Sequence, residues 1–137
     1  MKPVFSIPIR VYYEDTDAGK VVYYANYIKF MERARTEWLR ALGFEQDELL
    51  RRDGILFAVR SAKLDFLKPA RFNDLLQATV QIHQCGNASI TFNQQIRRDD
   101  LSLCEGEVKV ACIDAASFSP RPIPEYIKTR LVKGDMS

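Results

Sequence analysis

Three carboxylate side chains lie within four residues of one another near the N-terminus, at Glu14, Asp15 and Asp17. They precede an expected long helix, whose free N–H groups and dipole favour negative charge. Such a carboxylate is either a turn residue that caps the helix, or a base or nucleophile directed at a carbonyl that the helix N-terminus polarises. The residue types leave both interpretations open.

A calcium-binding loop is the first alternative for closely spaced aspartates. Counted from Asp15, the sixth loop position should be glycine and is Lys20, and the twelfth should be glutamate and is Asn26. The segment therefore does not match such a loop, and we expect no metal site there.

His83 is the only histidine, so any catalytic triad or Cys–His dyad would have to use it. It is two residues from Cys85 on an expected strand, where a solvent-facing side chain is the simpler interpretation. Together with Cys104 and Cys112, these residues match no usual zinc spacing. No glycine-rich phosphate loop occurs. We therefore expect neither a metal nor another cofactor.

The composition is that of an ordinary globular domain. The 137 residues are 47% hydrophobic and 28% charged, and 20 Lys and Arg against 18 Asp and Glu give a net charge of +2. This length predicts a single domain over residues 1–137. The near-balance of charge disfavours a nucleic-acid-binding protein.

The sequence shows no feature that directs it to a membrane. No apolar run approaches the ~20 residues that span a bilayer, and the N-terminus lacks the apolar core of a signal peptide. Three cysteines are an odd number in a chain long enough to fold without disulfides, so reduced thiols are expected. We therefore expect a cytoplasmic protein without a membrane span.

Apolar residues with helical spacing predict a long helix from about Tyr24 or Ala25 to Leu42. Gly43 follows where a left-handed C-terminal cap is expected. The residues expected on the apolar face are Tyr27, Phe30, Met31, Ala34, Trp38, Leu39 and Leu42.

Charged residues occupy the positions between these apolar ones. Acids and bases three residues apart are expected to pair along an exposed helix face, as Glu32 with Arg35 and Glu37 with Arg40.

Most of the remaining chain alternates between apolar and polar residues, as strands do. An alternating segment at 7–13 precedes the long helix, and further helices are expected at Gln46–Arg52 and Pro124–Leu131. Tight turns are indicated at 85–88 and 98–100. The strands expected after the short helix have their alternation within 55–66, 78–82, 90–96 and 108–112.

Consecutive strands joined by tight turns form an antiparallel sheet, and the long helix must pack on one face of it. The sequence therefore predicts an α+β fold with a sheet of about five strands. The edge strands of so small a sheet need covering, and pairing with a second copy of the chain provides this.

One long motif covers much of the first third of the chain. It comprises VYYEDTDAG at Val11–Gly19, VVYYANY at Val21–Tyr27 and ERARTE at Glu32–Glu37. The motif resembles the hotdog-fold acyl-CoA thioesterases. Within them it is similar to the Tol–Pal-associated (YbgC) branch, which is related to 4-hydroxybenzoyl-CoA thioesterase. The break at Lys68–Arg71 and the later strands fit the same resemblance.

The resemblance implies a hotdog fold, in which an antiparallel sheet wraps a long central helix. It also implies a homodimer with a continuous sheet, or a dimer of dimers, with the site at the dimer interface. The implied substrate is an acyl-CoA, hydrolysed without metal or prosthetic group.

The site residues follow from the same resemblance. It places the catalytic carboxylate at Asp17, as nucleophile or general base, and the oxyanion donor at the backbone N–H of Tyr24. By the same alignment Ala58, Val59 and Arg60 line the acyl or pantetheine channel.

Two positions depart from the family pattern. Members of this branch commonly have histidine where this chain has Tyr24; a backbone donor survives that change, whereas a role for an imidazole does not. The related hydroxybenzoyl enzymes carry basic residues at the hairpin that reads CGNA at Cys85–Ala88 here, so the contacts with the CoA phosphates are left unassigned.

The expected function is therefore that of an acyl-CoA thioesterase. The alternative, from another class, is a non-catalytic scaffold that binds acyl groups or an acyl-carrier protein. The resemblance to the Tol–Pal branch would link such a scaffold to envelope phospholipid metabolism.

Overall fold

A computed structural model describes residues 4–136 of the chain, so the outermost ends of the expected 1–137 domain lie outside the described residues. The secondary structure runs β, 3₁₀, α, α, four consecutive strands, α. The elements are β1 (Phe5–Arg10), the 3₁₀ turn η1 (Tyr13–Asp15), α1 (Ala25–Ala41), α2 (Gln46–Asp53), β2 (Ile55–Phe66), β3 (Leu75–Cys85), β4 (Ser89–Arg98), β5 (Leu101–Asp114) and α3 (Glu125–Met136).

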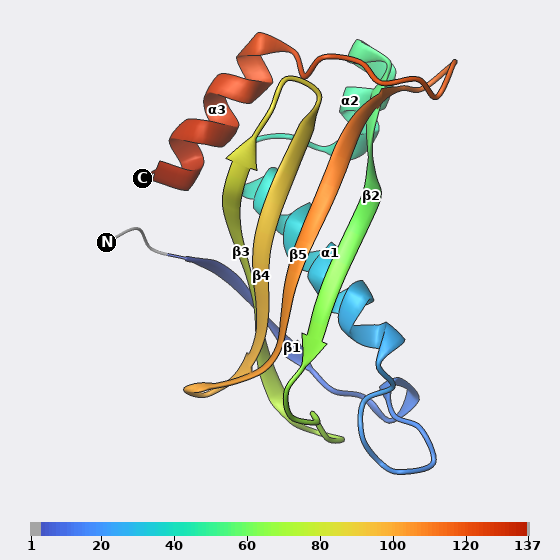
Figure 1. The fold of residues 1–137 in the computed structure, drawn as a ribbon, viewed down its shortest axis with the longest axis vertical. Helices are drawn as coiled ribbons and strands as arrows, with labels where there is room; N and C mark the ends of the chain where they lie inside the picture. The colour runs from blue at the N-terminus through green and yellow to red at the C-terminus, as the bar shows by residue number, and fades with distance from the viewer. Residues whose placement is uncertain (1–3, 137) are drawn as a thin grey trace.

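The five strands form one antiparallel sheet in the order β1-β3-β4-β5-β2 (Figure 1). The predicted α+β class and the five-stranded antiparallel sheet are therefore confirmed. β1 and β2, which flank α1 in sequence, lie at opposite edges of the sheet. This order leaves the 12-residue strand β2 with one unpaired side among the described residues.

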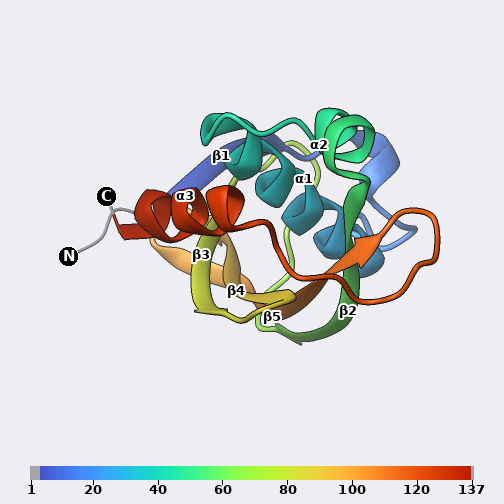
Figure 2. The ribbon, with the colours of Figure 1, turned by 90° about the horizontal axis from the view of Figure 1, so that it is seen from above.

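Helix α1 lies along one face of the curved sheet (Figure 2). Its buried side chains include Tyr27, Phe30, Met31 and Trp38, which follow the predicted apolar spacing. The helix ends at Ala41, one residue before the predicted end. Gly43 then adopts a φ of 95°, as expected for a left-handed cap. α1 packs mainly against β1, β3 and β4, so the side toward β2 is less covered.

Strand β2 contains a bulge, which explains why the apolar residues of this segment change from odd-numbered to even-numbered positions. Val59 pairs with Val110 and Ser61 with Lys109, so Arg60 is the extra residue. Because a bulge adds one residue to one strand, the side chains on its two sides alternate with opposite parity. The apolar positions accordingly change from 55, 57 and 59 to 62, 64 and 66.

Two other predicted element boundaries are wrong by several residues. The first strand ends at Arg10 and not at Tyr13, because the chain turns into η1. There the Asp15 carboxylate accepts the Tyr12 N–H at 2.8 Å, and the Thr16 hydroxyl donates to the Tyr13 carbonyl at 2.8 Å. Local side-chain hydrogen bonds thus replace the strand ladder. The last helix is longer than predicted, since it continues from Glu125 to Met136.

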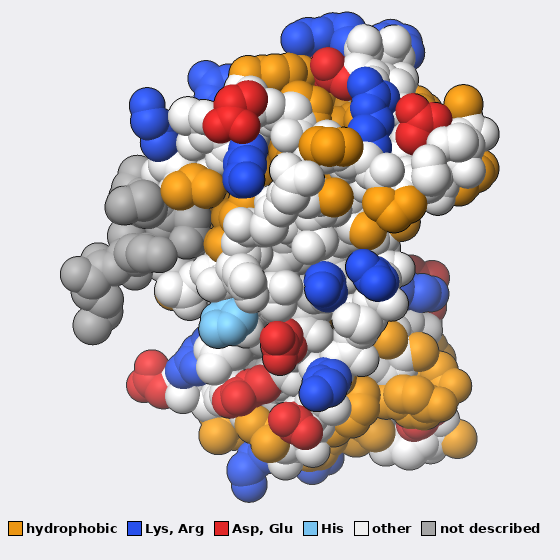
Figure 3. Space-filling model, turned by 45° about the horizontal axis from the view of Figure 1, so that its top comes forward, with side chains coloured by type: hydrophobic (Ala, Val, Ile, Leu, Met, Phe, Trp, Pro, Cys, Tyr) orange, Lys and Arg blue, Asp and Glu red, His pale blue; other side chains and the backbone are white. Residues whose placement is uncertain are grey.

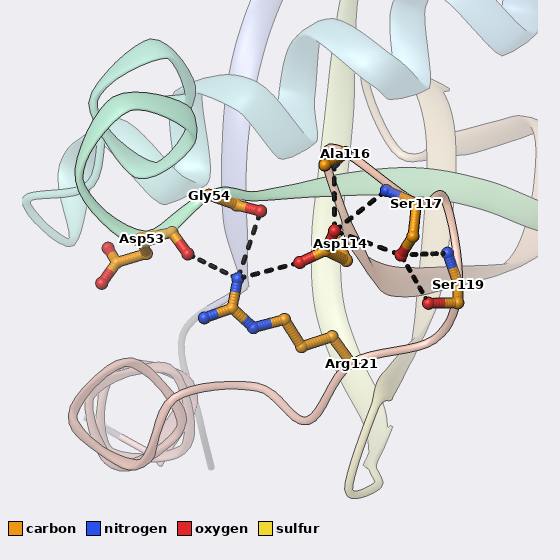
Figure 4. A network of polar contacts seen from close by, with 7 residues as sticks. All are labelled: Asp53, Gly54, Asp114, Ala116, Ser117, Ser119 and Arg121. Carbon is orange, nitrogen blue, oxygen red and sulfur yellow. Dashed lines mark hydrogen bonds and ion pairs between the residues drawn. The ribbon is translucent and has the colours of Figure 1, made fainter.

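The C-terminal segment is tied back to the junction between α2 and β2 (Figure 4). The Arg121 guanidinium donates to the carbonyls of Asp53 and Gly54 at 2.6 and 3.2 Å and lies 3.5 Å from Asp114. The Asp114 carboxylate in turn accepts three hydrogen bonds from the backbone of Ala116 and from the backbone and hydroxyl of Ser117. These contacts hold the chain that leads into α3.

The face of the sheet opposite α1 is polar. Acidic and basic side chains are interspersed over the face seen in Figure 3. A hollow of about 510 Å³ on this face is lined by side chains such as Lys63, Gln81, Asn93 and Glu107. The apolar core therefore lies on the α1 side of the sheet. No described helix is long and apolar enough to span a bilayer.

Candidate functional site

Asp17 lies at the corner of a narrow hairpin between η1 and α1. Its N–H donates to the Val21 carbonyl at 3.0 Å, and its own carbonyl accepts the Lys20 N–H at 2.9 Å. Thr16 and Val22 form an isolated antiparallel bridge below this turn. The turn is closed by Lys20, which adopts a φ of 65°. The backbone thus fixes where the Asp17 side chain starts.

The Asp17 carboxylate is exposed, and one of its two oxygens accepts a hydrogen bond. One oxygen, Oδ1, accepts the Gly19 N–H at 2.9 Å, and Gly19 is its one donor among the residues that the structure describes. The second oxygen is left for solvent or a ligand. The hydroxyl of Tyr24 and, to a smaller extent, the charge of Asp17 raise the pKa of Tyr23 above its usual value. Asp17 therefore lies within electrostatic reach of the tyrosines at the start of α1.

Backbone hydrogen bonds hold this hairpin against the helix. The Asp15 carbonyl accepts both the Tyr23 N–H at 3.0 Å and the Asn26 side-chain amide at 2.9 Å. The Val22 N–H donates to the Ala70 carbonyl at 2.8 Å. The acidic hairpin, the first turn of α1 and the connection from β2 to β3 therefore form one hydrogen-bonded unit.

The N-terminus of α1 presents free donors beside this unit. Tyr24 already has helical backbone angles, with φ −56° and ψ −32°. Within residues 4–136, no acceptor pairs with the N–H of Tyr24 or of Ala25, and no acidic residue lies in the first helical turn. The partial positive charge of the helix end is therefore not neutralised. Such N–H groups can stabilise an oxyanion that forms on a bound carbonyl.

Aromatic rings surround the start of the helix. The Tyr24 side chain is 60% exposed, and its ring centre lies 4.7 Å from that of Tyr23 and 6.0 Å from that of Phe66. A hollow of about 270 Å³ lies beside Tyr24. Its lining comprises Val22, Tyr24, Tyr27, Phe66, Leu67, Lys68 and Pro69. This hollow offers an apolar surface with one cationic side chain next to the free N–H groups.

Two further hollows follow α1 on the side of β2. The one closer to the helix start is a narrow space of about 10 Å³, lined by Ile28 and Met31 of α1 and by Ala62 and Leu64 of β2, among others. The next, of about 100 Å³, has a mixed lining. Its apolar residues are Leu39, Phe57, Val59, Ile90, Phe92 and Val110, and its polar ones are Glu32, Arg35, Thr36 and Gln46. Both hollows share Arg35 and Val59. A row of partly apolar hollows thus extends along the helix from its N-terminus.

The three residues predicted to line a channel have different positions. Val59 is about half exposed and lines both hollows along α1. Ala58 and Arg60 line neither of these hollows: Ala58 pairs with Ala111 of β5, and Arg60 is the exposed bulge residue.

Arg35 is a site residue that the sequence reasoning missed. The predicted Glu37–Arg40 ion pair is present. The predicted Glu32–Arg35 pair is wrong, since the ion pairs among the described residues do not include it. Arg35 is buried and donates to Gln94 of β4 at 2.9 Å. The spacing of Arg35 in the sequence indicated its burial, because a residue four positions after Met31 lies on the apolar face of the helix.

Candidate metal ligands do not gather in this region or elsewhere. Across the described residues, no group of three or more His, Cys, Asp or Glu side chains could hold a metal ion. His83 is exposed on β3. The described residues thus combine an exposed carboxylate, unpaired backbone N–H donors and partly apolar hollows in one candidate site.

Comparisons with known proteins place the chain in a family. The family profile described as thioesterase-like superfamily matches residues 11–131. The chain is 44% identical to the acyl-CoA thioesterase YbgC of Haemophilus influenzae over 90% of this chain and 91% of that protein. It is 42% identical to the acyl-CoA thioester hydrolase YbgC of Escherichia coli over 90% of this chain and 92% of that protein.

Solved structures show the same architecture. The crystal structure of a probable thioesterase from Bartonella henselae superposes with a TM-score of 0.85 at 33% identity, covering 89% of this chain and all of that one. The range matched by the family profile, residues 11–131, includes the acidic hairpin, the long helix and strands β2 to β5. This protein therefore belongs to the thioesterase-like superfamily of hotdog-fold proteins.

Proposed function

We propose that the protein is an acyl-CoA thioesterase, which converts an acyl-CoA and water into the free acid and coenzyme A. The relatives named as acyl-CoA thioester hydrolases support this activity, since their identity of 42–44% extends over most of the chain. The chain is a thioester hydrolase. The family profile covers residues 11–131, which supports one catalytic domain over the whole sequence.

One observation carries the mechanism: the hairpin that bears the Asp17 carboxylate is hydrogen-bonded, through the Asp15 carbonyl, to Tyr23 and Asn26, where α1 begins with unpaired N–H groups. The thioester carbonyl oxygen accepts a hydrogen bond from the Tyr24 N–H, so the charge that develops on it is stabilised by the helix end. Asp17 then acts in one of two ways. As a general base it takes a proton from water, whose oxygen attacks the carbonyl carbon; the C–S bond then breaks, and the departing CoA thiolate takes up the proton.

As a nucleophile, Asp17 itself attacks the carbonyl carbon and forms an anhydride with the acyl group. The C–S bond breaks and the CoA thiolate leaves. Water then hydrolyses the anhydride and restores the carboxylate. The free Oδ2 and the exposure of the side chain fit both routes, because either one needs an oxygen that is not already engaged.

A homodimer, or a dimer of dimers, completes the site in this proposal. β2 is a long edge strand, and unpaired edges of this kind pair readily with another chain. Val59 and Phe66 of β2 and Ile28 of α1 are each about half exposed, which gives a second copy an apolar surface to cover. In the dimer, Ala58, Val59 and Arg60 line the acyl or pantetheine channel.

The setting of the reaction is part of the same proposal. Coenzyme A is the carrier named for the relatives, and an acyl-carrier protein is the second carrier to test. Cys85, Cys104 and Cys112 are all free thiols, which fits a reducing cytoplasm. A link to the Tol–Pal system follows from the branch that the sequence resembles.

The test is thiol release from a panel of short, long and aromatic acyl-CoAs. Wild type is compared with Asp17→Asn, which keeps an oxygen able to accept the Gly19 N–H. Glu14→Gln, an exposed acid of the same segment, is the matched control. We expect Asp17→Asn to lose about 10²-fold or more in kcat, and Glu14→Gln to keep wild-type activity. Binding of acyl-CoA without thiol release by wild type would favour the non-catalytic scaffold instead.

A further inference from the structure

Arg35 combines a buried charge with access to the channel along α1. Its side chain is 8% exposed, and one guanidinium nitrogen, Nη1, donates to Gln94 Oε1 at 2.9 Å. The Gln94 amide is fixed in turn, because its Nε2 donates to the carbonyls of Met31 and Thr79 at 3.0 and 3.1 Å. The Arg35 side chain is therefore held in one orientation between α1 and β4.

The charge of Arg35 forms no ion pair with a carboxylate of the described residues. None of the ion pairs among the described residues involves it. Glu32 is the one acid whose charge influences it, and Glu32 is itself exposed and bonded to the Thr36 hydroxyl at 3.3 Å. Burial lowers the pKa of Arg35, as expected for a cation that has lost water. Buried charges without a partner are rare, since desolvation is costly.

Nη1 is the one guanidinium nitrogen of Arg35 with a hydrogen bond among the described residues. Ser102 Oγ is the one buried side-chain polar atom that lacks a hydrogen bond in the described part of the chain. The nitrogens of Arg35 other than Nη1 therefore keep some accessible surface. Arg35 lines both hollows along α1, and in the first of them every other lining residue is apolar: Ile28, Met31, Val59, Ala62, Leu64 and Val108.

We infer that Arg35 is a specificity-determining residue, which binds a carboxylate at the far end of the acyl group. This inference rests on the proposed thioesterase function. Arg35 follows Tyr24 by eleven residues, which is roughly 16 Å along a helix, and helical side chains lean toward the N-terminus. An acyl chain held at the Tyr24 N–H and running along α1 meets the guanidinium before that distance. A carboxylate suits it best, because arginine offers it charge-assisted hydrogen bonds.

The test compares three acyl-CoAs of equal chain length that end in a methyl, a hydroxyl or a carboxylate group, over a graded series of lengths. For wild type we expect kcat/KM to be about tenfold or more higher for the carboxylate at the matching length. Arg35→Met should remove this preference and leave the methyl-terminated substrate at least as reactive. Arg35→Lys should keep part of it. Arg33→Met, an exposed arginine of the same helix, is the control and should keep the wild-type ratios.

Other outcomes overturn the inference. A parallel loss on all three substrates, together with a lower Tm, would mean that Arg35 only supports the fold. A preference for the hydroxyl over the carboxylate would mean that the Glu32 charge decides the specificity. A third outcome is that light scattering shows the Arg35→Met protein to dissociate into monomers while its kcat/KM ratios among the three substrates stay unchanged. That result would mean that a second copy supplies the counter-charge of Arg35.

A failure of the proposed activity is distinguishable from a failure of this inference. If wild type releases no thiol from any substrate, the thioesterase proposal fails. Calorimetric binding of the same three acyl-CoAs to wild type and Arg35→Met then still decides the role of Arg35. Equal affinities for the methyl and carboxylate compounds would contradict it.

Discussion

The Tyr27 hydroxyl accepts the Ala70 N–H at 3.0 Å, and the Ala70 carbonyl accepts the Val22 N–H at 2.8 Å. Tyr27 belongs to the first turns of α1, whereas Val22 belongs to the hairpin that carries Asp17. Tyr27 and Ala70 are both buried. One phenol group therefore connects the helix that provides the N–H donors with the hairpin that provides the carboxylate.

Tyr27→Phe should weaken both the fold and the reaction. It leaves the buried Ala70 N–H without an acceptor, which costs about 1–3 kcal/mol in the free energy of unfolding. A shift of the hairpin relative to the helix should also lower kcat by about tenfold or more. Urea denaturation and thiol release measure the two effects. Unchanged kcat in a destabilised variant would show that the connection does not position Asp17.

Tyr27 should also make the stability of the fold depend on pH in the alkaline range. Burial raises the pKa of Tyr27 above the ordinary 10.0, because the ionised phenol is desolvated. The folded state then binds the proton more tightly than the unfolded state. The stabilisation is complete below about pH 10 and is lost as the pH rises through the raised value. Tyr27→Phe should therefore unfold with a shallower dependence on pH above that point.

Tyr24→Pro tests the backbone donor directly. Proline lacks the N–H, and its fixed φ of about −65° agrees with the value of −56° at Tyr24. The Tyr24 N–H has no acceptor among the described residues, so the fold loses no recorded hydrogen bond. We expect kcat to fall by about 10²–10³-fold, as for other lost oxyanion donors. Tyr24→Phe keeps the N–H and should keep the activity, and circular dichroism checks the helix content of both.

The three thiols should differ in reactivity. Burial, with smaller contributions from Asp65 and Glu105, raises the pKa of Cys104 to about 12, and both Cys104 and Cys112 are inaccessible. Cys85 is only partly buried, although burial also raises its pKa. Iodoacetamide should therefore modify Cys85 alone in the folded protein, and all three after denaturation. Peptide mass spectrometry measures this, and Cys85→Ser should abolish the native reaction.

Asp114 should stabilise the fold in a pH-dependent way. Hydrogen bonds from Ser117 lower its pKa below the ordinary 3.8. The contribution is present above that value and is lost as the pH falls through the lowered folded value. Asp114→Asn should be less stable than wild type at neutral pH, and the difference should shrink in acid. Urea midpoints across this range test it, with the exposed Asp100→Asn as control.

The edge of β2 should decide the oligomeric state. Ala62 lines the apolar hollow beside α1, whereas Lys63 lines the hollow on the polar face of the same strand. Ala62→Glu introduces a charge on the surface that a second copy would cover, so it should give monomers. Lys63→Glu should remain oligomeric. Light scattering of the purified proteins measures both masses, and a monomeric wild type would contradict the proposed dimer.

Much of this architecture can be predicted from the order of residue types. The helical spacing from Tyr27 to Leu39 predicted α1 to within one residue, because an apolar face must be buried for the helix to be stable. The change of phase between Val59 and Ala62 was visible in the sequence, but its cause, the bulge at Arg60, needed the pairing with β5. The turn at Tyr13–Asp15 was missed because side-chain hydrogen bonds outweighed the alternating pattern.

In the candidate site, too, some features could be predicted from the sequence and others needed the structure. The motif by itself determined the family, the acidic hairpin at Asp17 and the helix start at Tyr24, since these lie close together along the chain. Only the tertiary structure decided that Arg35 is buried, because its partner Gln94 is 59 residues away and reaches it across the sheet. The hollows along α1 likewise depend on the strand order, which places β2 at the edge and leaves its inner surface uncovered. A pattern in sequence fixes which face of an element is apolar, whereas contacts between distant elements fix what that face meets.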